Sequence, residues 1–250
     1  MGKTKIGIQL YSVRHDAVKD LKGTLKKLSA IGYEAVEFFG AGVFTTKEIL
    51  DALKESNLEI CGYHTPWEFV QDDLINLWTA YNKSIGNKYI IVPGLPKECT
   101  DSLQAWQKTA EKFNEIADKL KKEGMRLGYH NHWDEFKQID GKRPWDVFYE
   151  AACPCIIAQY DIGNSLRGTG IDAISYHSKY INQGITVHAK AYAANDKDAC
   201  IGEDDIDWGK YVEIIKNAGV TEYCIVEYEA QIDALYDKLT TSYNTLKKLF

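Results

Sequence analysis

Residues 126–136 read Arg-Leu-Gly-Tyr-His-Asn-His-Trp-Asp-Glu-Phe, and this stretch decides the fold prediction. Its apolar start predicts a β-strand, in which alternate side chains share a face, so His130 and His132 lie on the same side. Asp134 and Glu135 follow, which places imidazole and carboxylate groups at the carboxyl end of one strand. A single His–X–His pair also fits ordinary hydrogen-bonded residues, so a functional site requires matching chemistry on other strands.

The rest of the chain repeats a strand followed by a helix. Short apolar stretches predict seven more strands, at residues 5–13, 35–40, 59–64, 89–93, 156–161, 185–190 and 223–229. Helical spacing of apolar residues predicts helices at 16–31, from 45 or 46 to 56, at 72–85, from 100 or 101 up to Gly124, and at 144–152, 172–181, 206–218 and 232–249.

Helical spacing also predicts which side chains of two helices face the core. In the helix at residues 16–31 these are Val18, Leu21, Leu25 and Leu28. In the helix at residues 72–85 they are Leu74, Leu77, Trp78 and Tyr81.

Eight strand–helix units predict a closed (β/α)₈ TIM barrel of the α/β class, formed by residues 1–250 as a single domain. Strict alternation of strands and helices implies parallel strands with right-handed crossovers, and the active sites of such barrels lie at the carboxyl ends of the strands. A doubly wound open sheet is the alternative. It normally carries a glycine-rich turn after its first strand, where this chain has Tyr11-Ser12-Val13-Arg14.

Charge and composition exclude several classes of protein. The formal net charge is −6, which repels a nucleic-acid backbone on average, and the densest lysines, Lys119, Lys121 and Lys122, are interleaved with acidic residues. We therefore expect no nucleic-acid partner. Apolar runs are shorter than the ~18 residues of a membrane span, so we expect no membrane partner either. The start of the chain lacks the apolar core of a signal peptide, which predicts a cytoplasmic protein.

The six cysteines do not show the spacing of a metal site. The sequence favours free, mostly buried thiols, including the pair in Cys153-Pro154-Cys155, which cannot hold a metal alone.

Polar residues end most of the predicted strands, where a barrel would bring them into one cavity. They are Gln9, Glu37, His64, His130, His132, Glu135, Asp161, His188, Lys190, Glu227 and Glu229. Asp161 and Glu227 each follow an apolar run, where an ionised carboxylate needs a partner or a metal. Each acid alone also fits a helix cap or an ion pair. Together, three carboxylates and an imidazole suit one divalent ion, Mn²⁺, Mg²⁺, Co²⁺ or Zn²⁺.

The whole chain resembles the xylose isomerase-like barrel superfamily. This group contains sugar and sugar-phosphate isomerases and epimerases, inosose dehydratase, hydroxypyruvate isomerase and endonuclease IV. The resemblance rests on Ile8-Gln9-Leu10-Tyr11-Ser12, Gly32-Tyr33-Glu34-Ala35-Val36-Glu37, Tyr63-His64-Thr65-Pro66, residues 128–136, Asp161-Ile162-Gly163-Asn164, His188-Ala189-Lys190, Asp207-Trp208 and Val226-Glu227.

The resemblance implies a divalent metal, Mn²⁺ in the first instance, held by Glu135, Asp161, His188 and Glu227. His130 or His132 is the alternative to Glu135 because both precede it in the same stretch. Two positions depart from the family pattern. Asn164 stands where many relatives have His, and Ala191 stands where Asp commonly follows His–X–Lys.

The predicted function is a metal-dependent isomerase or epimerase of a free or modified sugar, acting through an enediolate by proton transfer next to a carbonyl. Glu135 and Glu227 are the candidate proton-transfer groups, and Glu37, His64, His130 and Lys190 the candidate substrate-binding groups. Trp67 and Trp133 are predicted either to stack on a sugar ring or to pack as part of the core or a lid. The sequence is compatible with a monomer and with a homo-oligomer.

Three alternative functions would make different demands on the sequence. A lyase or dehydratase acting on a keto-sugar or inosose would use the same metal and enediolate. An endonuclease IV-like phosphodiesterase would need more histidine ligands and a basic surface than this chain offers. A binding module would have no need for carboxylates at the ends of apolar strands.

Overall fold

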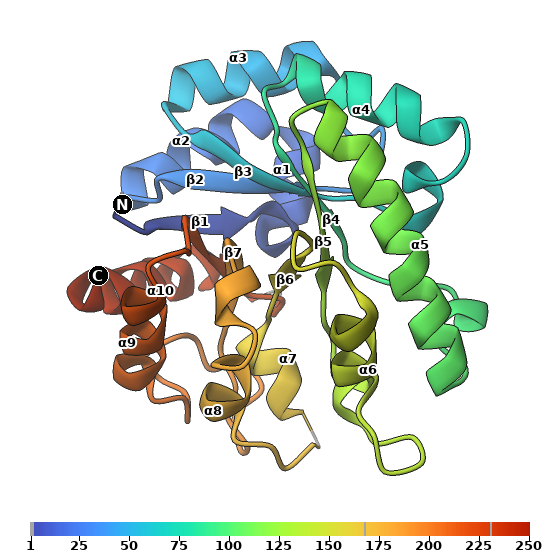
Figure 1. Ribbon diagram of the computed structural model, residues 1–250. Coiled ribbons are helices and arrows are strands. Elements are labelled where there is room, and N and C mark those ends of the chain that lie inside the picture. The colour runs from blue at the N-terminus through green and yellow to red at the C-terminus, as the bar shows by residue number, and fades with distance from the viewer. Residues whose placement is uncertain (1–2, 168, 231) are drawn as a thin grey trace.

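The computed structural model describes residues 3–167, 169–230 and 232–250. It contains a sheet of eight parallel strands in the order β6-β5-β4-β3-β2-β1-β8-β7 (Figure 1). The strands are β1 Lys5–Gln9, β2 Ala35–Phe39, β3 Glu59–His64, β4 Tyr89–Val92, β5 Arg126–His130, β6 Ile157–Gln159, β7 Thr186–Lys190 and β8 Tyr223–Glu227. A parallel bridge between Asp161 and His188, with the His188 N–H donating to the Tyr160 carbonyl over 2.9 Å, joins the two edges. The predicted single TIM barrel is therefore confirmed.

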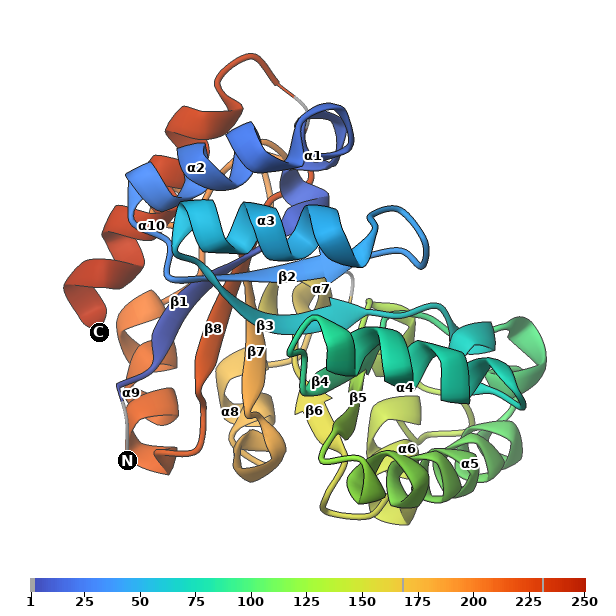
Figure 2. The same cartoon turned by 90° about the horizontal axis from the view of Figure 1, so that it is seen from above.

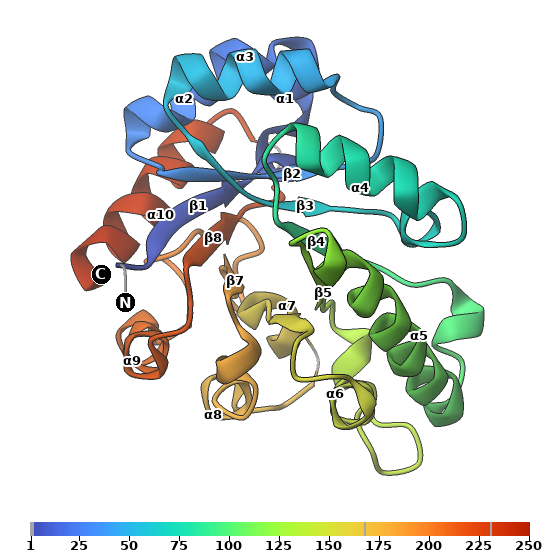
Figure 3. The ribbon, with the colours of Figure 1, turned by 45° about the horizontal axis from the view of Figure 1, so that its top comes forward.

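Helices surround the ring of strands (Figures 2 and 3). The α-helices are α1 Arg14–Lys19, α2 Leu21–Ile31, α3 Thr46–Ser56, α4 Leu74–Ser84, α5 Leu103–Lys122, α6 Pro144–Ala151, α7 Ile162–Leu166, α8 Ala173–His177, α9 Trp208–Ala218 and α10 Leu235–Leu249. Short 3₁₀ helices lie in the described connections, namely η1 Leu10–Val13, η2 Trp67–Val70, η3 Lys97–Cys99, η4 Asp134–Phe136 and η5 Ile181–Gln183. In the part of the chain that the structure describes, no helix has the length and hydrophobicity to cross a membrane.

Strand packing inside the barrel is close enough to require glycine in β5. A Cβ atom at Gly128 would lie 2.5 Å from Ile91 Cδ1 and 2.9 Å from the Cβ atom of Ile157. Both contacts are too short for real atoms, and the side chains that cause them are completely buried. The apolar strand β4 and the short strand β6 can therefore approach β5 only because residue 128 has no side chain.

The helix predicted at residues 16–31 is two helices, α1 and α2. Asp20 separates them, and its side chain accepts a hydrogen bond from Gly23 N over 2.9 Å, which starts α2 as a new helix. Leu21, Leu25 and Leu28 are buried as predicted, but Val18 is 64% exposed because it belongs to the separate helix α1.

The buried face of α4 differs from the predicted one. Leu74 and Leu77 were expected inward, but Leu77 is 70% exposed. Trp78 is buried as predicted, and its Nε1 donates to Thr65 Oγ1 over 2.8 Å. The helix also buries Asn82, which was not predicted, and whose Nδ2 donates to the Trp78 carbonyl over 2.9 Å. These bonds make a partly polar face compatible with burial, which a hydrophobic pattern alone does not predict.

Three predictions around β6 need correction. The strand predicted at residues 156–161 is only Ile157–Gln159, and the helix predicted at 172–181 is the short α8, preceded by an unpredicted helix α7. Cys153 and Cys155 form a disulfide rather than two free thiols, since the turn at Pro154 brings their Cα atoms to 5.2 Å. The remaining cysteines, Cys61, Cys99, Cys200 and Cys224, are free.

Candidate metal centre and substrate cavity

Four residues from neighbouring strands converge at the carboxyl end of the barrel. His130 ends β5, Asp161 follows β6, His188 lies in β7 and Glu227 ends β8. One potential ligand atom from each lies within 4.8 Å of the others, and all four side chains are buried. Two nitrogen and two oxygen donors at this spacing make a candidate divalent-metal site.

The two oxygens of Asp161 have different surroundings. Oδ1 accepts a hydrogen bond from Asn164 N over 2.7 Å and thereby caps α7. Oδ2 is buried without a hydrogen-bond partner among the described residues, and it lies 3.9 Å from His188 Nδ1, too far for a hydrogen bond. Burial raises the pKa of Asp161 to about 6, against the opposing charge of Lys190. Because a buried carboxylate oxygen without a donor is costly, Oδ2 fits a position beside a cation.

His130 presents the nitrogen that a metal would need. Gln159 Nε2 donates to Glu37 Oε1 over 2.8 Å and to Thr186 Oγ1 over 3.0 Å, which assigns Gln159 Oε1 as an acceptor. His130 Nδ1, 3.1 Å from that oxygen, is therefore assigned the proton, and the lone pair lies on Nε2. Burial and the neighbouring His188 lower the pKa of His130 well below its usual value, so the ring is neutral.

His188 lies between two carboxylates. Its Nε2 is 2.7 Å from Glu37 Oε2, and its Nδ1 is 2.8 Å from Glu227 Oε2. Burial alone lowers the pKa of His188, but Glu37 and Glu227 outweigh it and raise the pKa to about 10. Both ring nitrogens are then protonated, so His188 can bind a metal only if Nδ1 releases its proton. Glu37 behind Nε2 would fix the orientation of the ring, as carboxylates commonly do behind histidine metal ligands.

Glu37 occupies the back of this cluster and is completely buried. It also accepts a hydrogen bond from Gln9 Nε2 over 2.7 Å. Space for its carboxylate depends on Gly62 in β3, since a Cβ atom there would lie 2.5 Å from Glu37 Oε1. Burial raises the pKa of Glu37, but the charges of His64 and His188 outweigh it and lower the pKa to about 2. Glu37, predicted to bind substrate, does not line the cavity described below.

Glu135 is not brought into the cluster. Its carboxylate accepts hydrogen bonds from the Tyr129 hydroxyl over 2.5 Å and from His132 N over 2.9 Å. The 3₁₀ turn η4 directs the side chain back along β5, where it holds the turn after the strand. The alternative raised by the sequence, His130, takes the fourth position in the group of candidate ligands.

A cavity of about 840 Å³ opens above the cluster at the carboxyl end of the barrel. His130 and Glu227 belong both to the cluster and to the cavity wall, and His64 and His132 also line it. Lys190 is buried beside the cavity, with its Nζ 3.3 Å from Glu227 Oε1 and 2.9 Å from Glu229 Oε1.

The two candidate tryptophans have different positions. Trp67 lines the cavity. Trp133 is not among the described lining residues, and the Arg167 guanidinium lies 5.6 Å from the centre of its ring.

Sequence reasoning missed two residues that position Asp161 and the histidines. Asn131 accepts from Asp161 N over 2.8 Å and donates to the Asp161 carbonyl over 3.0 Å, which fixes the end of β6. Gln159 contacts both His64 and His130. A signal for Gln159 was present, because it is a polar residue two positions before Asp161 in an apolar strand and shares its face.

Solved structures with the same fold have low sequence identity to this chain. A sugar phosphate isomerase/epimerase from Parabacteroides distasonis ATCC 8503 superposes with a TM-score of 0.85 at 21% identity, covering 99% of this chain and 94% of that one. A D-tagatose 3-epimerase-like protein gives 0.71 at 16% identity, covering 98% and 97%. The IOLI protein with a binding zinc atom gives 0.72 at 12% identity, covering 98% of both chains. No curated protein sequence matches significantly.

The family comparison covers most of the chain. Residues 25–245 match the sequence model described as the xylose isomerase-like TIM barrel. The matched region includes the four clustered residues from β5 to β8 and the helices between them. The chain therefore belongs to the xylose isomerase-like TIM barrel family.

Proposed function

We propose that this protein is a divalent-metal-dependent sugar isomerase or epimerase. The observation that carries the proposal is the buried group of His130, Asp161, His188 and Glu227 beneath a large cavity, with Asp161 Oδ2 lacking a hydrogen-bond partner among the described residues. Such a group is expensive to bury unless a cation completes it. The names of structural relatives, a sugar phosphate isomerase/epimerase and a D-tagatose 3-epimerase-like protein, agree with sugar chemistry in this fold.

The proposed metal ligands are His130, Asp161, His188 and Glu227. This set replaces the predicted Glu135 by His130, since Glu135 already accepts two hydrogen bonds outside the cluster. Two nitrogen and two oxygen donors suit Mn²⁺ or Zn²⁺ better than Mg²⁺, which prefers oxygen ligands. Glu37 is proposed to position His188 rather than to bind substrate, because it contacts the ring nitrogen that faces away from Glu227.

When bound, a divalent cation would polarise the substrate carbonyl and favour loss of the proton on the neighbouring carbon. Glu227 is proposed to take that proton, since its carboxylate lines the cavity at the end of β8. His132 is proposed as the second proton-transfer group in place of Glu135, because its ring lines the cavity from the turn after β5. His64 would accept a hydrogen bond from a substrate hydroxyl, since its Nε2 already donates to Gln159 Oε1 over 2.8 Å, and Lys190 would hold Glu227 in place.

Solvent exchange tests this proposal directly. The Mn²⁺-loaded protein is incubated in heavy water with ketoses, keto-glycosides and inososes, and deuterium uptake next to the carbonyl is followed by mass spectrometry and NMR. We expect uptake with at least one substrate, and a fall of about 100-fold in Glu227→Gln measured at restored metal occupancy. Glu222→Gln is the matched control, since Glu222 lies just before the start of β8 and bonds to Tyr89.

The outcomes separate the alternatives. Uptake without loss of a hydroxyl supports the isomerase or epimerase, whereas loss of water from the substrate indicates a dehydratase that uses the same residues. Metal-saturated Glu227→Gln exchanging at the parent rate would overturn the assigned proton-transfer role.

A further inference from the structure

The cavity wall is acidic. Glu68, Glu98, Glu227 and Glu229 line it, and neither Lys nor Arg is among the described lining residues. The ammonium group of Lys190 lies beside the wall, but it contacts both Glu227 and Glu229. A phosphate dianion on the part of the substrate away from the metal centre would meet these carboxylates, with neither Lys nor Arg among the described lining residues to pair with it, which disfavours phosphorylated sugars.

The outer part of the same cavity is apolar. Tyr11 and Phe39 form one side, with ring centroids 5.4 Å apart in an edge-to-face contact. Leu95 and Pro96 lie in the loop after β4 and also line the cavity. The volume of about 840 Å³ lies in the upper part of the ~300–1,000 Å³ range of pockets that enclose drug-sized ligands, which are larger than one sugar ring. Space and apolar surface are therefore left beyond a monosaccharide at the metal centre.

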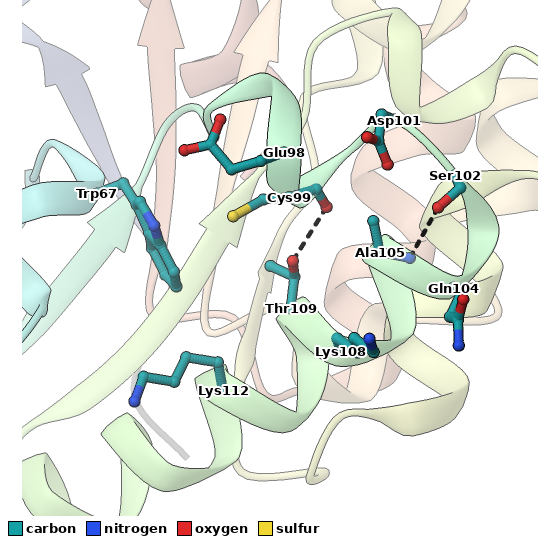
Figure 4. Close-up of a pocket in the computed structure, with 10 residues that line it drawn as sticks. All are labelled: Trp67, Glu98, Cys99, Asp101, Ser102, Gln104, Ala105, Lys108, Thr109 and Lys112. Carbon is teal, nitrogen blue, oxygen red and sulfur yellow. Dashed lines mark hydrogen bonds between the residues drawn. The ribbon is translucent and has the colours of Figure 1, made fainter.

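Trp67 connects this cavity to a second one of about 380 Å³, which lies against η3 and the start of α5. Figure 4 shows Trp67 on one side of the second cavity, with Glu98 and Cys99 from η3 and Thr109 and Lys112 from α5 around it. Trp67 and Glu98 line both cavities. Phe113 stacks on Trp67 with ring centroids 5.3 Å apart, so the indole is held in place while still bordering both spaces. A fixed indole at such a junction is suited to stacking on a ligand ring.

We propose that the substrate is an uncharged glycoside, in which the reacting sugar lies over the metal centre and an appended ring lies against Trp67. This inference rests on the proposed function for the position of the reacting sugar. The appended ring needs a flat apolar face. An aromatic aglycone and a second sugar both offer such a face. Tyr11, Phe39, Leu95 and Pro96 complete the apolar surroundings of that ring.

Ligand binding tests the inference without relying on turnover. Calorimetry and ligand-observed NMR on the Mn²⁺-loaded protein compare four groups of probes built on the common hexoses: methyl glycosides, phenyl glycosides, disaccharides and hexose 6-phosphates. We expect phenyl glycosides or disaccharides to bind about tenfold tighter than the matching methyl glycosides, and the phosphates to bind no tighter than the free hexoses. Preference between the phenyl and disaccharide probes identifies the source of the ring.

Trp67→Leu is the decisive variant, since leucine keeps an apolar contact with Phe113 but offers no flat ring. It should abolish the tenfold advantage while leaving the binding of methyl glycosides and Mn²⁺ unchanged. Trp133→Leu is the matched control and should retain the advantage, because Trp133 is not among the described lining residues.

Three results would overturn the inference: phosphates binding tenfold tighter than free hexoses, an advantage that survives in Trp67→Leu, or no probe binding in the millimolar range. Failure of the proposed function is distinguishable. If ring-dependent binding is found but heavy-water exchange is absent with every substrate, the glycoside site stands and the isomerase assignment fails.

Discussion

Two buried side chains, Asp161 after β6 and His177 at the end of α8, hold polar atoms without hydrogen-bond partners among the described residues, and their surroundings differ. Asp161 Oδ2 lies among three other potential metal ligands. His177, at the end of α8, leaves both ring nitrogens unpartnered, but it stacks on Tyr160 with ring centroids 4.4 Å apart and lies 5.5 Å from the Tyr211 ring. Aromatic rings surround His177, and among the described residues it belongs to no candidate group of metal ligands.

A buried polar atom without a hydrogen-bond partner can therefore have two different causes. Burial by itself lowers the pKa of His177 to about 3, whereas the pKa of Asp161 is raised by burial and by the charge of Glu227 and is lowered by the charge of Lys190. An unpartnered atom therefore indicates a ligand only where other donors converge on the same point. Where aromatic rings surround the atom, its missing hydrogen bond lowers the stability of the protein, and packing offsets that loss.

The largest expected effect is on metal binding. Asp161→Asn keeps an oxygen that can cap α7 but replaces the unpartnered oxygen by an amide, so affinity for Mn²⁺ should fall by at least ~100-fold. His177→Phe should leave the affinity unchanged. Equilibrium dialysis with metal analysis measures both affinities. Equal losses of Mn²⁺ affinity in the two variants would show that Asp161 and His177 do not differ as metal ligands.

A smaller effect is expected on the pH dependence of stability. The pKa of His177 is about 3 when folded, against 6.5 for an ordinary histidine, so between these values the unfolded chain binds a proton that the folded chain does not. Its contribution to stability is therefore complete above pH 6.5 and falls as the pH falls, by about 2 kcal/mol at pH 5.

His177→Phe removes this titration while keeping a ring against Tyr160. Urea unfolding at pH 7 and pH 5 should show a smaller acid-induced loss in the variant than in the parent. A loss of the same size in both proteins would mean that His177 accepts a proton in the folded state, and that the aromatic region is more polar than its contacts indicate.

Local sequence patterns predicted most of the strands that position the site. The strand Glu59–His64 has the predicted bounds, and Asp161, His188 and Glu227 converge because parallel strands bring their carboxyl ends to one face. Features that depend on a single capping hydrogen bond were not predicted, such as the break at Asp20 and the helix α7 capped by Asp161. Gln159 was missed because its contacts reach residues 95 and 122 positions away in the chain.

The choice between Glu135 and His130 shows where sequence reasoning ends. His130 ends β5 and Glu135 follows it in η4, and the family resemblance implies Glu135. The direction of the Glu135 side chain is set by the turn η4 and by the Tyr129 hydroxyl, which a spacing pattern does not encode.

The smallest expected effect is therefore at Glu135, and it sharpens the contrast with Asp161. Glu135→Gln keeps an acceptor for the Tyr129 hydroxyl, but its amide nitrogen cannot accept from His132 N. We expect a loss of about 1 kcal/mol in the free energy of unfolding, the usual scale for one hydrogen bond, with affinity for Mn²⁺ changed less than about threefold. Urea unfolding and equilibrium dialysis measure the two quantities on the same samples. A variant that keeps its stability but loses metal would restore Glu135 as the ligand implied by the family resemblance. It would also require the turn after β5 to rearrange when metal binds, because the carboxylate points away from the cluster in this structure.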